Sequence, residues 1–282
     1  MKYALLALSM SAAVTKNMVS RAGKAAFGSG RGMLRANMAT AVLGLIVFGI
    51  AGLNFSLFTA DVLVLAVLYG LCTLIAQTLH IIAVRTGPVS VCSLIYSSGF
   101  IIPSVFSTLA YGEPFSLGRG VGVALLLVSI VLVSAPSAEK GGRKWLLFEI
   151  GAMMASGGLG VLQKMFRVAH AETGMNEFLF AAFGTMLLTA LVLYPAFHEP
   201  SERVKGAPLM VLLLAAALVT VNKLNLYLSG ALPGAVFFPC INGGNMALTA
   251  VAASILFRER LKPGQIAGVI GAAGAIVIIA LT

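Results

Sequence analysis

The feature that most constrains this chain is a series of ten apolar stretches, each long enough to cross a lipid bilayer. About 20 apolar residues of helix span the hydrocarbon core of a membrane. The stretches lie at residues 3–22, 33–52, 61–84, 88–110, 117–135, 145–169, 177–197, 208–229, 233–256 and 264–281, with short polar breaks between them. The sequence therefore predicts an all-α membrane protein with ten transmembrane helices.

The composition also indicates a lipid environment. The chain is 59% apolar and 10% charged, with a mean hydropathy of +1.00, whereas soluble domains contain about 25% charged residues. Only Lys2 precedes the first apolar stretch, and no small-residue cleavage site is recognisable before Lys16. We therefore expect a first transmembrane helix rather than a signal peptide. The expected location is the cell membrane, in a bacterium the cytoplasmic membrane.

The formal net charge is +10, which in a soluble protein would suggest a nucleic-acid partner. Here the basic residues are spread over interhelical loops, so we expect no nucleic acid. One side of the predicted topology carries Arg21, Lys24, Arg31, Arg35, Arg85, Lys140, Arg143, Lys144, Arg203, Lys205, Arg258, Arg260 and Lys262. The other side carries Lys2, Arg119 and Arg167. By the positive-inside rule the richer side faces the cytoplasm, and both termini lie outside.

The chain also contains an internal repeat, because a shift of 146 residues aligns residues 86–134 with 232–280 without a gap. The shift pairs Glu113, Gly118 and Gly122 with Glu259, Gly264 and Gly268. Five spans per half is an odd number, so the second half starts on the opposite side of the membrane. We expect two inverted five-helix repeats, residues 1–135 and 145–282, joined by a basic linker at 136–144.

With these two corners, and with Lys16 and Lys164 after the first helix of each half, the chain resembles the drug/metabolite transporter superfamily. It is most similar to the ten-helix EamA-type members, and the resemblance extends over nearly the whole chain. The resemblance implies a carrier of small metabolites, with the substrate between the two halves. Such relatives usually keep both termini in the cytoplasm, which is the opposite of the orientation that the basic residues predict.

Polar side chains inside the spans are candidates for contact with a substrate, because burying them in lipid is costly unless they line a wet cavity. We expect six of them to bind a substrate near the middle of the bilayer: Gln77, Tyr96, Asn222, Lys223, Asn242 and Asn245. They come from spans 3, 4, 8 and 9, which face each other if the halves are inverted. Gln77 and Lys223 are equivalent positions under the repeat.

Other roles for polar residues in the spans remain open. Asn242 and Asn245 lie three residues apart on one helical face, where they can also bond neighbouring helices. Glu149 follows Trp145 by four residues and can be an acid favoured by the first turn of a helix. Four basic side chains lie where they can reach the lipid headgroups: Lys16, His80, Lys164 and Lys223.

The four-helix small multidrug resistance proteins of the same superfamily depend on a glutamate in the middle of the first helix. Alignment on the following lysine puts Leu8 and Ser156 at that position. Proton-coupled export of cationic drugs by that mechanism is therefore disfavoured. Lysines outnumber acids within the spans, which favours a neutral, zwitterionic or anionic solute.

We find no catalytic cluster, phosphate-binding loop or metal-ligand spacing, and Cys72, Cys92 and Cys240 lie in apolar spans without paired spacing. No enzyme activity, cofactor or metal is expected. The expected function is that of a secondary transporter or facilitator, which moves an amino acid, a nucleoside or a similar polar metabolite by alternating access. A multidrug-type exporter and a lipid-handling or accessory membrane protein are the alternatives. Expected partners are the small-molecule substrate and membrane lipid, and the protein is expected to be a monomer or a homodimer.

Overall fold

The computed structural model describes residues 1–23, 29–86, 92, 95–133, 144–197, 207–256 and 262–282. In these ranges the chain is helical and contains no β-strand. The α-helices are α1 (Lys2–Ala22), α3 (Gly30–Ile50), α4 (Ala60–Thr86), α6 (Ile101–Tyr111), α7 (Leu117–Val133), α8 (Lys144–His170), α9 (Met175–Leu193), α10 (Ala207–Ala231), α11 (Gly234–Leu256) and α12 (Pro263–Leu281). Short 3-10 helices are η1 (Phe55–Leu57), η2 (Ser98–Phe100) and η3 (Tyr194–Ala196).

These helices lie at the positions of the predicted spans. Seven of those in the described ranges are long and apolar enough to cross a membrane: α3, α4, α8, α9, α10, α11 and α12. Shorter apolar helices cover Ile95–Tyr111 and Leu117–Leu132. The predicted linker at 136–144 lies outside the described residues except for Lys144. The all-helical prediction is confirmed, and the long apolar helices are consistent with a multi-pass membrane protein.

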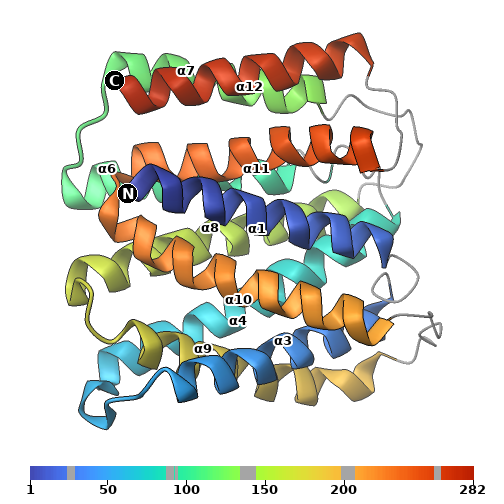
Figure 1. Ribbon diagram of the computed structural model, residues 1–282, viewed down its shortest axis with the longest axis vertical. Helices are drawn as coiled ribbons and strands as arrows, with labels where there is room; N and C mark the ends of the chain where they lie inside the picture. The colour runs from blue at the N-terminus through green and yellow to red at the C-terminus, as the bar shows by residue number, and fades with distance from the viewer. Residues whose placement is uncertain (24–28, 87–91, 93–94, 134–143, 198–206, 257–261) are drawn as a thin grey trace.

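The helices pack side by side in a bundle and run across the view in Figure 1. The main pairs are α4 with α8, α1 with α10, α3 with α9, and α7 with α12. Two apolar clusters fill the interior. One surrounds Phe166, Phe178 and Phe183 among α3, α4, α8 and α9, and the other surrounds Leu126 and Phe237 among α1, α7, α10, α11 and α12.

Glycines allow α7 and α12 to pack closely in opposite directions. A β-carbon on Gly118 would lie 2.6 Å from Thr282 Cγ2, and one on Gly122 would lie 2.6 Å from Ile279 Cγ1. The start of α7 therefore meets the end of α12. In the second half of the predicted corner motif, Gly268 is buried, Gly264 has open space around it, and Glu259 lies outside the described residues.

The helix ends next to the basic loops gather at one end of the bundle. The last residues of α1 and the first residues of α3, α8 and α12 lie at the right of Figure 1, whereas both chain termini lie at the left. We call these the basic end and the far end. At the basic end, Arg35 Nε donates to the Tyr194 hydroxyl at 2.9 Å. One sequence assignment is wrong: Arg167, counted with the loops, lies inside α8 and is buried.

Candidate functional site

A small cavity with a mostly apolar lining and several polar side chains lies between α3, α4, α9 and α10. Its walls are Thr40, Tyr69, Gly70, Thr73, Gln77, Ala182, Phe183, Met186, Leu218 and Asn222. The polar residues come from α3, α4 and α10, and the apolar surface comes mainly from α9. The free space is about 20 Å³, which is enough for about one water molecule. In this conformation the cavity is therefore too small for a metabolite.

Tyr69 connects three helices at one wall of this cavity. Its hydroxyl donates to Asn222 Oδ1 of α10 at 2.6 Å and accepts from Gln163 Nε2 of α8 at 2.8 Å. The Asn222 amide nitrogen donates to the Leu218 carbonyl of its own helix at 2.8 Å. Tyr69 and Gln163 are both buried. This chain of bonds satisfies buried polar groups, and it holds fixed dipoles beside the cavity.

The structure places two of the six predicted binding residues, Gln77 and Asn222, in the walls of this cavity. Lys223 follows Asn222 in α10 but points to a different place. Its Nζ donates to Asn176 Oδ1 of α9 at 2.6 Å and lies 5.7 Å from the centre of the Phe48 ring of α3. The ammonium group therefore contacts two neighbouring helices, α9 and α3.

The other three predicted binding residues lie elsewhere. The Tyr96 ring packs against the imidazole of His80, with 4.5 Å between the ring centres. Asn242 Nδ2 donates to the Phe238 carbonyl of its own helix at 2.9 Å. Asn245 Oδ1 accepts from Asn17 Nδ2 of α1 at 3.2 Å. The structure therefore distributes the six residues among separate contacts and does not bring them into one cavity.

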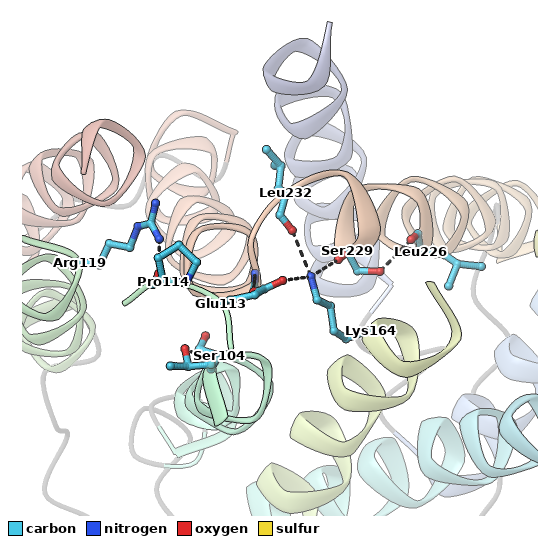
Figure 2. A network of polar contacts seen from close by, with 10 residues as sticks. Ser104, Glu113, Pro114, Arg119, Lys164, Leu226, Ser229 and Leu232 are labelled. Carbon is cyan, nitrogen blue, oxygen red and sulfur yellow. Dashed lines mark hydrogen bonds and ion pairs between the residues drawn. The ribbon is translucent and has the colours of Figure 1, made fainter. Parts of the chain in front are cut away.

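An ion pair at the far end joins residues that are distant in sequence (Figure 2). Lys164 of α8 pairs with Glu113, which lies between α6 and α7. Lys164 Nζ also donates to the Ser229 carbonyl at 3.1 Å and to the Leu232 carbonyl at 3.5 Å. Glu113 Oε2 accepts from the Gly234 amide at 2.6 Å. We call these groups the far-end network. The prediction that Lys164 reaches the headgroups is wrong, because its side chain is 4% exposed.

The far-end network satisfies the backbone where α10 ends and α11 begins. The first amides of a helix lack partners within the helix, and so do its last carbonyls. Glu113 provides an acceptor at the start of α11, where negative charge is favourable, and Lys164 provides donors at the end of α10. Gly112, at φ 63°, ends α6 in the left-handed conformation and brings Glu113 to this position. Any movement that separates these helix ends must break the network.

A second carboxylate is buried near the basic end. Glu149 of α8 is 0% exposed, and His80 Nδ1 of α4 lies 2.9 Å and 3.1 Å from its two carboxylate oxygens. The Cys92 thiol is also hydrogen-bonded to this carboxylate. Glu149 and His80, which the sequence analysis considered separately, therefore bond each other.

Tyr69 was not among the predicted binding residues, although it carried a usable signal. A tyrosine in the middle of an apolar helix brings a hydroxyl that needs a partner when it is buried. Gln163 is a second polar residue in an apolar stretch. What sequence could not supply was their proximity, because α4 and α8 are far apart along the chain.

No known protein family and no curated protein matches this sequence. Among solved structures, 28 chains match. One of them, described as "Crystal structure of protein", aligns over 99% of this chain and 98% of its own length, with a TM-score of 0.75 and 14% sequence identity. At that identity the likeness shows a shared fold over the whole chain.

Proposed function

We propose that this protein is a secondary transporter or facilitator for a small polar solute, of the EamA type in the drug/metabolite transporter superfamily. The observation that carries the proposal is a cavity between long apolar helices into whose lining several polar side chains are built. Tyr69, Gln77 and Asn222 lie in the middle third of α4 and α10, and they also line the cavity. Hydrogen-bonding groups at this depth are costly in lipid, and they mark substrate pathways in membrane proteins.

The pairing of the helices supports two inverted five-helix halves, α1 to α7 and α8 to α12. When each helix is replaced by its counterpart in the other half, the α4–α8 pair becomes α10–α1, and the α4–α9 pair becomes α10–α3. The same exchange converts α6–α8 into α11–α1 and leaves the α3–α9 and α7–α12 pairs unchanged. Inverted repeats around a central site are the architecture expected of alternating access.

The contacts suggest how such a carrier would work. The far-end network closes one end, and the free space at the cavity is about 20 Å³, so a solute enters only when helices separate. Solute hydroxyl, amide or carboxylate groups then take the place of partners at Tyr69, Gln77 and Asn222, which compensates for the loss of their hydration. The excess of lysines over acids within the predicted spans favours neutral, zwitterionic or anionic solutes over cations.

The test is uptake of labelled amino acids, nucleosides and related metabolites into proteoliposomes that contain the purified full-length chain. We expect at least one solute to enter faster than into protein-free liposomes, and we expect Asn222→Leu to abolish that difference. Tyr3→Phe is the matched control, because Tyr3 is 58% exposed at the far end of α1. Uptake at the level of protein-free liposomes for every solute would contradict the proposal.

The lipid-handling alternative is distinguished in the same vesicles. A fluorescent phospholipid placed in one leaflet reports transfer between leaflets through its accessibility to a membrane-impermeant quencher. A transporter of polar solutes leaves the lipid asymmetry at the level of protein-free liposomes. Rapid lipid transfer without solute uptake would favour the alternative.

A further inference from the structure

We propose that His80 and Glu149 form a proton-binding site that couples solute transport to a proton gradient. The coupling rests on the proposed transport function, whereas proton binding by the pair does not. The site is separate from the cavity and from the far-end network. It lies near the basic end, because His80 is close to the end of α4 and Glu149 lies just after the first turn of α8.

The geometry of the pair is that of a shared proton site. Glu149 is fully buried, and His80 Nδ1 is within hydrogen-bonding distance of both of its carboxylate oxygens. The His80 side chain is 28% exposed, so the buried carboxylate has one partner that reaches the surface. A proton can therefore pass between the surface and Glu149 by way of the imidazole.

The surroundings of the pair contain few other titratable groups among the described residues. His80 faces the carboxylate from α4, and Cys92 and Tyr96 face it from the segment before η2. Further along α8, Gly157 packs against Gly99 of η2, and Gly160 packs against Pro103 of α6. In the part of the chain that the structure describes, no three His, Cys, Asp or Glu side chains are arranged to hold a metal ion.

The charge balance links proton release to movement. With one shared proton, the pair carries no net charge, whether the proton resides on Nδ1 or on the carboxylate. Loss of that proton leaves a net negative charge inside the bundle, which is unfavourable unless water or another donor reaches Glu149. A conformational change that separates α4 from α8 admits water and lets the proton leave. Proton exchange and helix movement then occur together, as coupling requires.

The pair is connected to a further polar group of α8, Ser156. Glu149 precedes Ser156 by two helical turns and lies on the same face of α8. Tyr96 bridges the two levels, because its hydroxyl bonds to Ser156 and its ring packs on His80. These contacts extend the polar surroundings of the pair along α8.

The first test measures proton binding without any solute. Infrared difference spectra of the full-length protein in lipid, recorded between about pH 5 and pH 8, report protonation of carboxyl and imidazole groups. We expect a carboxyl signal and an imidazole signal that disappear together in Glu149→Gln and also in His80→Gln. Glu172→Gln is the control, since Glu172 is exposed. Difference spectra of Glu149→Gln identical to those of the wild type would overturn the site.

The second test measures coupling with the labelled amino acids and nucleosides in proteoliposomes. For one proton per solute, each unit of pH difference supports about tenfold accumulation. We expect Glu149→Gln to retain exchange of solute across the membrane without a gradient but to lose accumulation. Accumulation by Glu149→Gln equal to that of the wild type would overturn the coupling. So would solute uptake by the wild type that is independent of the pH gradient.

The two tests separate the two proposals. A titrating Glu149 signal in a protein that moves no solute would contradict the transport function and leave the proton site in place. Solute uptake by a protein whose spectra do not change in Glu149→Gln would support the transport function and contradict the proton site.

Discussion

Lys164 of α8 and Glu113, which lies between α6 and α7, form a partly buried ion pair at the far end of the bundle. Each partner makes a second contact with the backbone that joins α10 to α11. Glu113 accepts from the Gly234 amide, and Lys164 donates to the Ser229 carbonyl. The pair therefore stabilises the corner between α10 and α11, and it also joins α8 to the segment between α6 and α7. It connects the first half of the sequence to the second.

Removing one partner of this pair leaves a buried charge without compensation. We expect Glu113→Gln to lower the free energy of unfolding by about 3 to 5 kcal/mol, because it leaves the Lys164 charge, which is 4% exposed, without its carboxylate. Lys164→Met has a smaller effect, because the Glu113 carboxylate that it leaves is 18% exposed. The Glu113→Gln/Lys164→Met double variant should recover part of the loss. Thermal unfolding in detergent measures all three against Lys144→Met, which removes an exposed lysine of the same helix. A Lys164→Met variant as stable as the wild type would contradict this view of the network.

The positions of the helices could be predicted because hydrophobicity is a local property of the sequence. Stretches such as 61–84 and 145–169 match α4 and α8 closely, and no distant contact is needed to recognise them. The corner residues Glu113 and Lys164 could also be selected, from the repeat and the family resemblance. Their contact could not be predicted, because it depends on how α8 and the α6–α7 corner meet in space.

The candidate site illustrates the same limit. Gln77 and Asn222 were selected as polar residues within apolar spans, and both line the cavity. Asn242 satisfied the same criterion, but its amide bonds to its own helix. His80 and Glu149 each had a plausible surface role when considered singly. Only the packing of α4 against α8 reveals that they are partners.

The hydroxyl of Tyr69 is expected to contribute to both packing and binding. Tyr69→Phe keeps the ring but leaves Gln163 and Asn222 without their shared partner. Each buried polar group without a partner costs about 1 to 3 kcal/mol. We expect a lower melting temperature and a KM for solute uptake raised by about tenfold or more, corresponding to about 1.4 kcal/mol. Tyr3→Phe is the control. An unchanged KM would exclude the hydroxyl from solute binding.

Asn242 and Asn245 should differ when each is changed to leucine. Asn245 bonds to Asn17 across the α1–α11 contact, whereas Asn242 bonds within its own helix. Hydrogen bonds between membrane helices average about 0.6 kcal/mol. We expect Asn245→Leu to reduce the yield of folded protein in membranes and Asn242→Leu to leave it near that of the wild type. Lost transport at normal yield in Asn242→Leu would favour the role in solute binding predicted from the sequence.

The close contact of α7 with α12 should depend on Gly122. A β-carbon there would lie 2.6 Å from Ile279 Cγ1 and 3.2 Å from the Ala275 carbonyl oxygen. Overpacking of this kind typically costs about 1 to 3 kcal/mol. We therefore expect Gly122→Ala to lower the melting temperature. Gly274→Ala is the matched control, because a β-carbon at Gly274 meets nothing within 4 Å. Equal melting temperatures for the two variants would contradict the close contact.

The orientation in the membrane is decided by which end of the bundle faces the cytoplasm. The basic residues favour a cytoplasmic basic end and outward termini, whereas the family resemblance implies cytoplasmic termini. Thr282 is exposed at the C-terminal end of α12, and Ala22 is exposed at the last turn of α1. Cys72, Cys92 and Cys240 are first replaced by alanine, and a single cysteine is then introduced at either position. None of these changes alters the distribution of basic residues.

A membrane-impermeant maleimide reagent applied to intact cells then reports the side of each cysteine. We expect Thr282→Cys to be labelled in intact cells, and Ala22→Cys to be labelled only after the membrane is permeabilised. This result would also place the His80–Glu149 pair near the cytoplasmic side, because the pair lies near the basic end. The opposite labelling pattern would show that the excess of Lys and Arg at the basic end does not set the orientation of this chain.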